Sequence, residues 1–104
     1  MDVVLNHKTN RFNLLLALYI AADADYDHAI NMKLLADQRE IEPQKFEKAF
    51  KYLLEENFIE LRDGGNDYLS AISHKGVKVV EEVFLDPKKQ TYYFPPYRDM
   101  RGRE

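Results

Sequence analysis

The 104-residue sequence contains no cysteine. This absence excludes a disulfide framework, a zinc site with thiolate ligands and a cysteine nucleophile. It is also typical of proteins in the reducing cytoplasm, because disulfides form mainly in oxidising compartments. A chain of this length holds one modest core, so we expect a single cytoplasmic folding unit plus its ends.

Long apolar runs are also missing. The longest one, residues 14–22, is well short of the roughly 20 residues that a transmembrane helix needs. Near the start of the chain, Asp2 and a short apolar stretch stand where a secretory signal has basic residues and a longer apolar segment. The sequence therefore predicts neither export nor insertion into a membrane.

Positive charge is not in excess, since the formal net charge is −3 at pH 7. Proteins that bind nucleic acids usually carry a positive excess that neutralises phosphates. Any interaction of this chain with DNA must therefore depend on a local group of basic residues.

Catalytic and metal-binding signatures are absent as well. The three histidines are too far apart for the spacing of a helical metal pair, and no phosphate-binding glycine loop or nucleophile elbow occurs. Aspartates alternate over residues 23–27 as at the start of a calcium loop, but His28 and Leu34 stand where that loop needs glycine and glutamate. We expect no enzymatic activity, no cofactor and no metal site.

Apolar residues that recur at helical spacing are the main positive signal. The helix predicted over residues 11–23 has apolar side chains on nearly every side, which indicates the most buried helix of the domain. The clearest one-sided pattern is in residues 43–56, where the apolar face consists of Phe46, Ala49, Phe50, Leu53 and Leu54. A short helix over residues 32–39 and a fourth helix from Ser73 to Asp86 complete the set. In the fourth helix, the residues expected to face the core are Val77, Val80, Val83 and Phe84.

Capping and turn residues mark the ends of these elements. A very short strand is predicted at residues 28–30, and two longer strand-like segments cover residues 58–62 and 68–72. Between the longer two, residues 63–66 read Asp-Gly-Gly-Asn, which predicts a β-hairpin. Pro43 suits the first turn of the third helix, and the expected N-caps of the other helices are Thr9 or Asn10, Asn31 and Ser73.

This order of helix, helix, helix, hairpin and helix resembles the winged helix-turn-helix superfamily, most closely the small bacterial MarR and PadR kinds of regulator. The similar segments are Leu34-Leu35-Ala36, residues 54–60 as the junction from helix to wing, and residues 72–76 as the start of the last helix. Arg39 and Glu40 depart from the usual apolar residue and glycine at the helix-turn-helix turn. The resemblance implies an α+β, mostly α fold with a three-helix body, a β-hairpin wing and a fourth helix.

In such folds the third helix enters the major groove of DNA. At about 100° per residue, the inward apolar face of residues 43–56 leaves the opposite side to solvent. Arg62, near the tip of the wing, is a candidate for a phosphate or minor-groove contact, although Asp63 and Asp67 flank it. The candidate DNA contacts on the third helix are Gln44, Lys45, Lys48 and Lys51. An ordinary solvated face with Glu47–Lys51 and Lys51–Glu55 pairs explains the same residues.

Residues 1–85 form the expected domain, and residues 86–104 form a C-terminal extension without regular structure. The extension mixes aromatic, proline and basic residues, a composition that suits packing on its own domain or on a second subunit, and also stacking on single-stranded nucleic acid. We expect an arm that stabilises a homodimer, with the partner contacts Tyr92, Tyr93, Phe94 and Tyr97.

Two functions remain open from the sequence. The first is a transcriptional regulator that binds duplex DNA through the third helix and the wing, without a cofactor. The second is a protein-interaction or dimerisation module on the same scaffold, supported by the acidic net charge and the aromatic tail.

Overall fold

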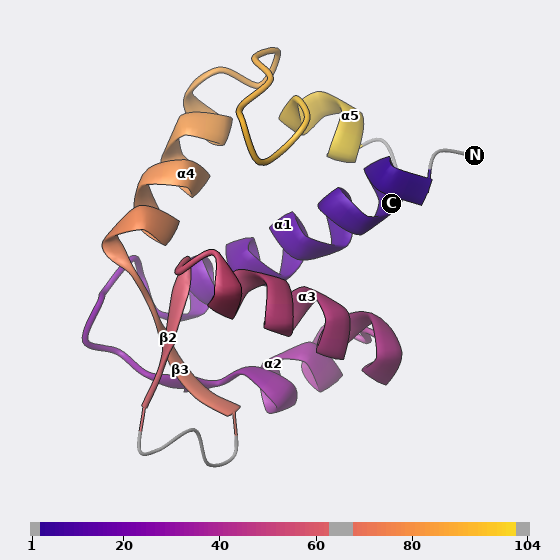
Figure 1. Cartoon of the computed structure of the whole chain (residues 1–104). Coiled ribbons are helices and arrows are strands. Elements are labelled where there is room, and N and C mark those ends of the chain that lie inside the picture. Colours follow the sequence, from indigo (N-terminus) through magenta and orange to yellow (C-terminus); the bar gives the residue numbers. More distant parts are fainter. Residues whose placement is uncertain (1–2, 63–67, 102–104) are drawn as a thin grey trace.

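The computed structural model describes residues 3–62 and 68–101. It shows an α+β fold that is mostly helical, with a small three-stranded antiparallel sheet (Figure 1). None of the helices within these two ranges is both long and apolar enough to cross a membrane. The elements are α1 (Val3–Ala21), β1 (Ile30–Asn31), α2 (Met32–Gln38), α3 (Pro43–Glu55), β2 (Ile59–Leu61), β3 (Leu69–Ile72), α4 (His74–Leu85) and α5 (Tyr97–Arg101).

The central helix is α1, which contacts α2, α3, α4 and β3 (Figure 1). The side chains of Phe12, Leu15 and Leu18 are fully buried, as the apolar pattern on all sides of this helix predicts. The predicted start at Arg11 was wrong, because α1 begins at Val3. Thr9 and Asn10, the two expected N-caps, both lie inside the helix, since no proline or glycine between Val3 and Ala21 interrupts the helical hydrogen bonds.

Two of the predicted N-caps are confirmed. The side chain of Asn31 accepts a hydrogen bond from the Leu34 N–H at 2.9 Å, and Ser73 accepts one from the Gly76 N–H at 3.0 Å. Pro43 occupies the first turn of α3 as expected. These caps fix where α2 and α4 begin, because they satisfy backbone donors that have no partner within the helix.

The sheet has the strand order β1-β3-β2, with both pairings antiparallel. Ile59 lies opposite Ile72 in the β2–β3 hairpin, which confirms the two predicted strands. The short first strand is Ile30–Asn31 rather than residues 28–30, because only these residues pair with β3. The predicted turn at residues 63–66 lies outside the described residues.

The inward faces of α3 and α4 carry most of the predicted core residues. Phe46, Ala49, Phe50 and Leu53 of α3 are buried, and so are Val77, Val80 and Val83 of α4. Phe84 does not lie inside the core as predicted, since it is 39% exposed. Its ring lies at the edge of the core, with its centroid 4.6 Å from that of Tyr97.

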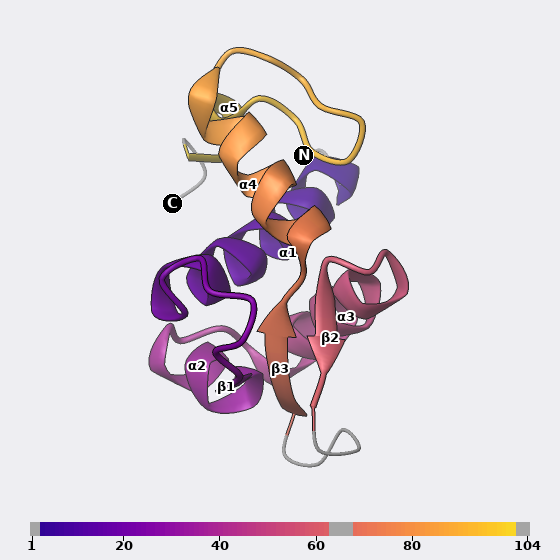
Figure 2. The same ribbon diagram turned by 90° about the vertical axis from the view of Figure 1, so that its left-hand side faces the viewer.

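The segment after α4 folds back over the body of the molecule. It forms a loop and the short helix α5, beside the N-terminal half of α1 (Figures 1 and 2). The prediction that residues 86–104 contain no regular element was therefore wrong. Phe94 and Met100 are 0% and 2% exposed, so this segment completes the same core as α1.

Candidate nucleic-acid interface

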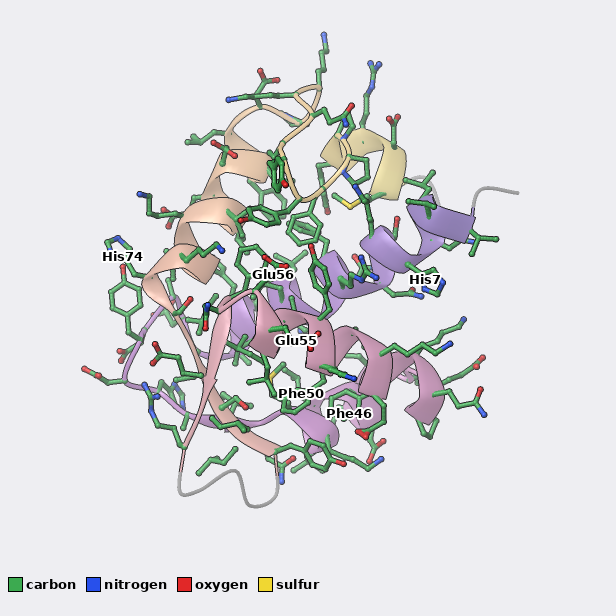
Figure 3. The ribbon with its side chains drawn as sticks, in the orientation of Figure 1. His7, Phe46, Phe50, Glu55, Glu56 and His74 are labelled. Carbon is green, nitrogen blue, oxygen red and sulfur yellow. The ribbon has the colours of Figure 1, made fainter. Side chains whose placement is uncertain are left out.

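The outward face of α3 carries the basic residues that the sequence pattern predicts there. All four predicted contacts, Gln44, Lys45, Lys48 and Lys51, are exposed. Their exposure follows from the burial of Phe46 and Phe50 on the other side of the helix (Figure 3). The stacked rings of these two residues have centroids 5.3 Å apart and face the core. Three amino groups are therefore presented on one solvent-facing surface.

Ion pairing leaves most of these lysines available. Lys45 Nζ lies 3.8 Å from Glu42 Oε1, one turn before it. Lys48 and Lys51 form no ion pair with any residue that the structure describes. The Glu47–Lys51 and Lys51–Glu55 pairs of the alternative interpretation, an ordinary solvated face, are therefore not made. An exposed lysine without a carboxylate partner can neutralise a phosphate without first breaking another contact.

Tyr68 fixes the hairpin against α3. Its ring packs edge-on against Phe46 and Phe50, with centroid distances of 5.3 and 5.1 Å, and its hydroxyl donates to Glu47 Oε2 at 3.4 Å. This hydrogen bond raises the pKa of Tyr68 above its ordinary value. The role of Tyr68 was not predicted from the sequence. The sequence contained one signal for it: Tyr68 is an aromatic residue at the start of the second predicted hairpin strand, and the apolar face of the third predicted helix carries two phenylalanines.

Arg62 is on the hairpin as predicted but is engaged within the chain. Its Nη1 donates to Glu60 Oε1 at 3.1 Å, and its Nη2 donates to the Tyr26 carbonyl oxygen at 3.3 Å. These contacts connect β2 with the loop before β1. Arg62 would have to leave both acceptors before it could contact a phosphate, which makes it a weaker candidate than the lysines of α3.

Acidic side chains share the α3 surface with the lysines. Glu42, Glu47 and Glu55 are all exposed, at the beginning, middle and end of the helix. Each carboxylate reduces the attraction of this face for a polyanion. The surface is therefore locally mixed in charge, with the least compensated positive charge at Lys48 and Lys51.

The four predicted partner contacts of the C-terminal segment have different environments. Phe94 is fully buried, and its ring lies edge-on to Phe12 with a centroid distance of 5.1 Å, so it has no surface left for a second subunit. Tyr93 and Tyr97 are half-buried on Phe58 and Phe84. Only Tyr92, 89% exposed, presents most of its side chain to solvent. The packing of Phe94 corrects its assignment to a partner interface.

The aspartate-rich loop between α1 and β1 is organised by turns. Asp25 Oδ1 accepts a hydrogen bond from the Asp27 N–H at 2.8 Å, and Asp23 has a positive φ of 53°. Across residues 3–62 and 68–101, no three histidine or carboxylate side chains gather in a group that could hold a metal ion. Turn formation accounts for the aspartates of this loop.

Compared with models of protein families, with curated proteins and with solved structures, the chain has no match.

Proposed function

We propose that the chain is a winged helix-turn-helix domain that binds duplex DNA and regulates transcription, with α3 in the major groove and the β2–β3 hairpin as the wing. The support begins with the element order, in which three helices precede a two-stranded hairpin and a further helix follows. Proteins of this kind place the helix before the hairpin in the groove and present its outward side chains to bases and phosphates.

The observation that carries the proposal is the outward face of α3. Lys48 and Lys51 are exposed and unpaired within the described chain, and Gln44 lies on the same side near the N-terminus of the helix. In this arrangement the lysines would contact phosphates and the glutamine could hydrogen-bond an adenine edge. The Tyr68 contacts hold the hairpin beside this helix, so both elements can meet one duplex.

The test is a titration of labelled duplex DNA at several salt concentrations. The wild-type chain should lose affinity steeply as salt rises, because bound lysines release counterions from the DNA. Replacing Lys45, Lys48 and Lys51 together with glutamine should make the slope of log affinity against log salt shallower. The expected reduction is about one for each phosphate that the variant no longer neutralises.

A matched control keeps the same change in net charge. The triple variant Lys78→Gln, Lys88→Gln and Lys89→Gln alters exposed residues of α4 and the following loop. It should retain nearly the wild-type salt slope. Absence of DNA binding by the wild-type chain at low salt, or equal losses in the two triple variants, would refute the proposed interface.

The second candidate function is a protein-interaction or homodimerisation module. The observation in its favour is the exposure of two large side chains around the C-terminal segment, Tyr92 at 89% and Leu85 at 85%. Large exposed apolar and aromatic residues are enriched at protein interfaces. Light scattering of the wild-type chain and of a Leu85→Ser/Tyr92→Ser variant would test this function. A dimer that the double substitution dissociates would support it, and a monomeric wild-type chain would contradict homodimerisation.

A further inference from the structure

A groove of about 440 Å³ lies between α4 and the loop that follows this helix. It extends along α4 from the first turn, where His74 lies (Figure 3), to Glu82, and Tyr92 and Tyr93 of the loop form its other side. Small-molecule sites commonly have volumes of about 300–1,000 Å³, so a planar ring with its substituents fits this space. None of the described residues of α3 lines the groove, which is therefore separate from the proposed duplex interface.

A closed turn presents the two tyrosines. The Thr91 N–H and hydroxyl both donate to the Phe94 carbonyl oxygen, at 3.0 and 3.1 Å, and the Phe94 N–H donates to Thr91 Oγ1 at 3.0 Å. Thr91 is 7% exposed and Phe94 is fully buried, so both ends of the turn are anchored in the body of the protein. Tyr92 and Tyr93 lie between these ends. Their backbone is thus ordered before a ligand arrives, which lowers the entropic cost of binding.

The ring of Tyr92 is open to a planar ligand. Tyr92 is 89% exposed, and the ring beside it is that of Tyr93, with a centroid distance of 4.9 Å and an angle of 84° between the planes. A perpendicular contact of this kind covers an edge or one face of a ring, never both faces. Tyr93 in turn packs edge-on against the buried Phe58, with centroids 4.8 Å apart. At least one face of Tyr92 is therefore available for stacking, on a support that is itself packed against the core.

Positive charge lies beside these rings. Lys78 of α4 lines the groove, is exposed and forms no ion pair with any residue that the structure describes. Lys75, one turn earlier, lines the groove as well. Its Nζ lies 4.9 Å from the centroid of the Tyr93 ring and donates to the Glu56 carbonyl oxygen at 2.8 Å. These two contacts fix the ammonium group of Lys75 next to the aromatic rings.

Carboxylates near the groove are partly compensated. Glu82 Oε2 lies 4.0 Å from Lys89 Nζ, and Glu56 Oε1 lies 4.0 Å from Lys75 Nζ. Residues 86–90 of the loop read Asp-Pro-Lys-Lys-Gln, which adds two lysines and one aspartate. The uncompensated charge of the groove is therefore positive and centred on Lys78. An anionic group is favoured beside the open ring.

We propose that this groove binds single-stranded nucleic acid, with one base stacked on Tyr92 and the adjacent phosphate on Lys78. Open aromatic rings next to basic side chains are the usual features of such sites. A single strand exposes the flat faces of its bases, whereas in a duplex the bases are paired and stacked on one another. The groove therefore takes a single strand, and duplex binding through α3 does not depend on it.

The occupant is a strand and not a free nucleotide. Tyr92 is open on most sides, so an isolated base stacked on it keeps its other face in water. A strand also brings neighbouring phosphates, and Lys88 and Lys89 of the adjacent loop are exposed. Because the two contributions add, a strand should bind more tightly than one nucleotide.

The test is a fluorescence anisotropy titration at low salt. The probe is a labelled oligodeoxythymidylate of about ten nucleotides, a length that suits small single-strand sites. The wild-type chain should bind this probe. Thymidine 5′-phosphate, added as a competitor at the same concentration of nucleotide, should displace much less of it than the unlabelled oligonucleotide does. Equal displacement by the two competitors would overturn the assignment to a strand.

Two substitutions of Tyr92 separate stacking from apolar contact. Tyr92→Leu keeps an apolar side chain without a flat ring, and should weaken binding by about five- to tenfold, the lower part of the range for one stacked base. Tyr92→Phe keeps the ring and should bind within about twofold of the wild type. Both variants should unfold at the wild-type temperature, because the side chain is exposed. A Tyr92→Leu chain that binds as the wild type does, or a Tyr92→Phe chain as weak as Tyr92→Leu, would refute stacking on this ring.

Lys78→Gln tests the phosphate contact. It should make the slope of log affinity against log salt shallower by about 0.7, the contribution of one phosphate in a single strand. The control is Lys48→Gln, an exposed lysine of α3, which should leave the affinity and the slope for the oligonucleotide unchanged. Equal changes in the two variants would indicate general attraction of anions and would refute the site.

The groove and the proposed duplex interface can fail independently. Replacing Lys45, Lys48 and Lys51 with glutamine should reduce affinity for the duplex and not for the oligodeoxythymidylate, and Tyr92→Leu should do the reverse. Binding of the single strand by a chain that binds no duplex would uphold the groove and refute the proposed function. Absence of single-strand binding at low salt would refute the groove as a nucleic-acid site. A dimer that Tyr92→Leu dissociates, measured by light scattering, would then assign the groove to a second copy of the chain.

Discussion

Gly76 lies where the first turn of α4 approaches the residue before β2. A Cβ atom at this position would collide with the carbonyl oxygen of Phe58 and lie 2.8 Å from Ile72 Cγ1. Alanine is the better helix former, so helix propensity alone would predict that Gly76→Ala stabilises the chain. We expect the opposite, a loss of about 1–3 kcal/mol in the free energy of unfolding, because the backbone must move to admit the methyl group.

Urea unfolding of Gly76→Ala tests this prediction. The control is Lys78→Ala in the same helix, an exposed position at which the change should stay within about 0.5 kcal/mol. A Gly76→Ala chain as stable as the wild type would show that α4 can shift away from Phe58 freely.

The ring of Tyr52 in α3 lies beneath Arg11 of α1, and the pKa of its hydroxyl reports the partial burial of the ring. Burial raises the pKa of Tyr52, the Glu56 carboxylate raises it further, and Arg11 lowers it in part. Since its folded-state pKa exceeds the unfolded value of about 10, the neutral phenol stabilises the fold below that pH. This contribution is lost as the pH rises through the folded-state pKa.

An alkaline titration of tyrosinate absorbance checks the direction of this shift. The difference between the wild type and Tyr52→Phe should be one tyrosine that ionises above its ordinary pKa of about 10. If the substitution instead removes a tyrosine with an ordinary pKa, then the ring is more hydrated than its half-buried position implies.

Among the elements, the C-terminal segment has the least regular sequence and yet completes the core. Phe94 packs on Phe12 and Phe58, and its side chain is fully buried. Phe94→Ala should therefore lower the free energy of unfolding by about 3–5 kcal/mol, the usual effect of emptying a buried phenylalanine site. Tyr92→Ala, two residues earlier and exposed, should change it by no more than about 0.5 kcal/mol. Equal, small effects in a denaturant titration would mean that the segment does not pack on α1.

Periodicity and capping were sufficient to predict the middle of the chain. The buried face of α3 with Phe46 and Phe50 follows from side-chain spacing alone. The first residues of α2 and α4 follow from the N-caps Asn31 and Ser73. Each of these signals is local, because it involves residues within one or two turns of a helix. The outward lysines were predicted for the same reason.

Signals that depend on distant residues were missed. The first turns of α1 were missed because its two initial valines are exposed and do not continue the buried apolar pattern of the helix. Burial of Phe94 depends on a surface formed by α1 and by the residue before β2, far away in the sequence. The Arg62–Tyr26 hydrogen bond and the groove between α4 and the following loop likewise exist only after the helices pack together.

At the scale of the whole molecule, the net charge of −3 acts against the lysines of α3. The molecule measures 37 × 26 × 22 Å. The Debye length is about 30 Å at 0.01 M salt and about 8 Å at 0.15 M. At low salt every carboxylate thus acts on a bound duplex, whereas at physiological salt only those beside the interface do.

This difference predicts how two acidic residues affect DNA affinity. Glu55→Gln, on the proposed interface, should strengthen binding by roughly two- to fivefold at both salt concentrations, equivalent to about 0.4–1 kcal/mol. Glu82→Gln, on α4 and away from α3 (Figure 1), should strengthen it only at the lower concentration. Equal effects of both substitutions at physiological salt, measured by the same DNA titration, would contradict binding through α3.

β3 is the central strand of the sheet and connects the hairpin with the strand that leads into α2. One edge of β3 pairs with β2 of the hairpin, and the other pairs with β1, where Asn31 lies opposite Leu69. Asn31 is also the residue that caps α2. Movement of the hairpin away from the helices would therefore separate Asn31 from Leu69. Because Asn31 caps α2, the same movement would loosen the first turn of that helix. The amide hydrogens of Leu34 and Ser70, although far apart in the chain, should then exchange with solvent in a single cooperative opening.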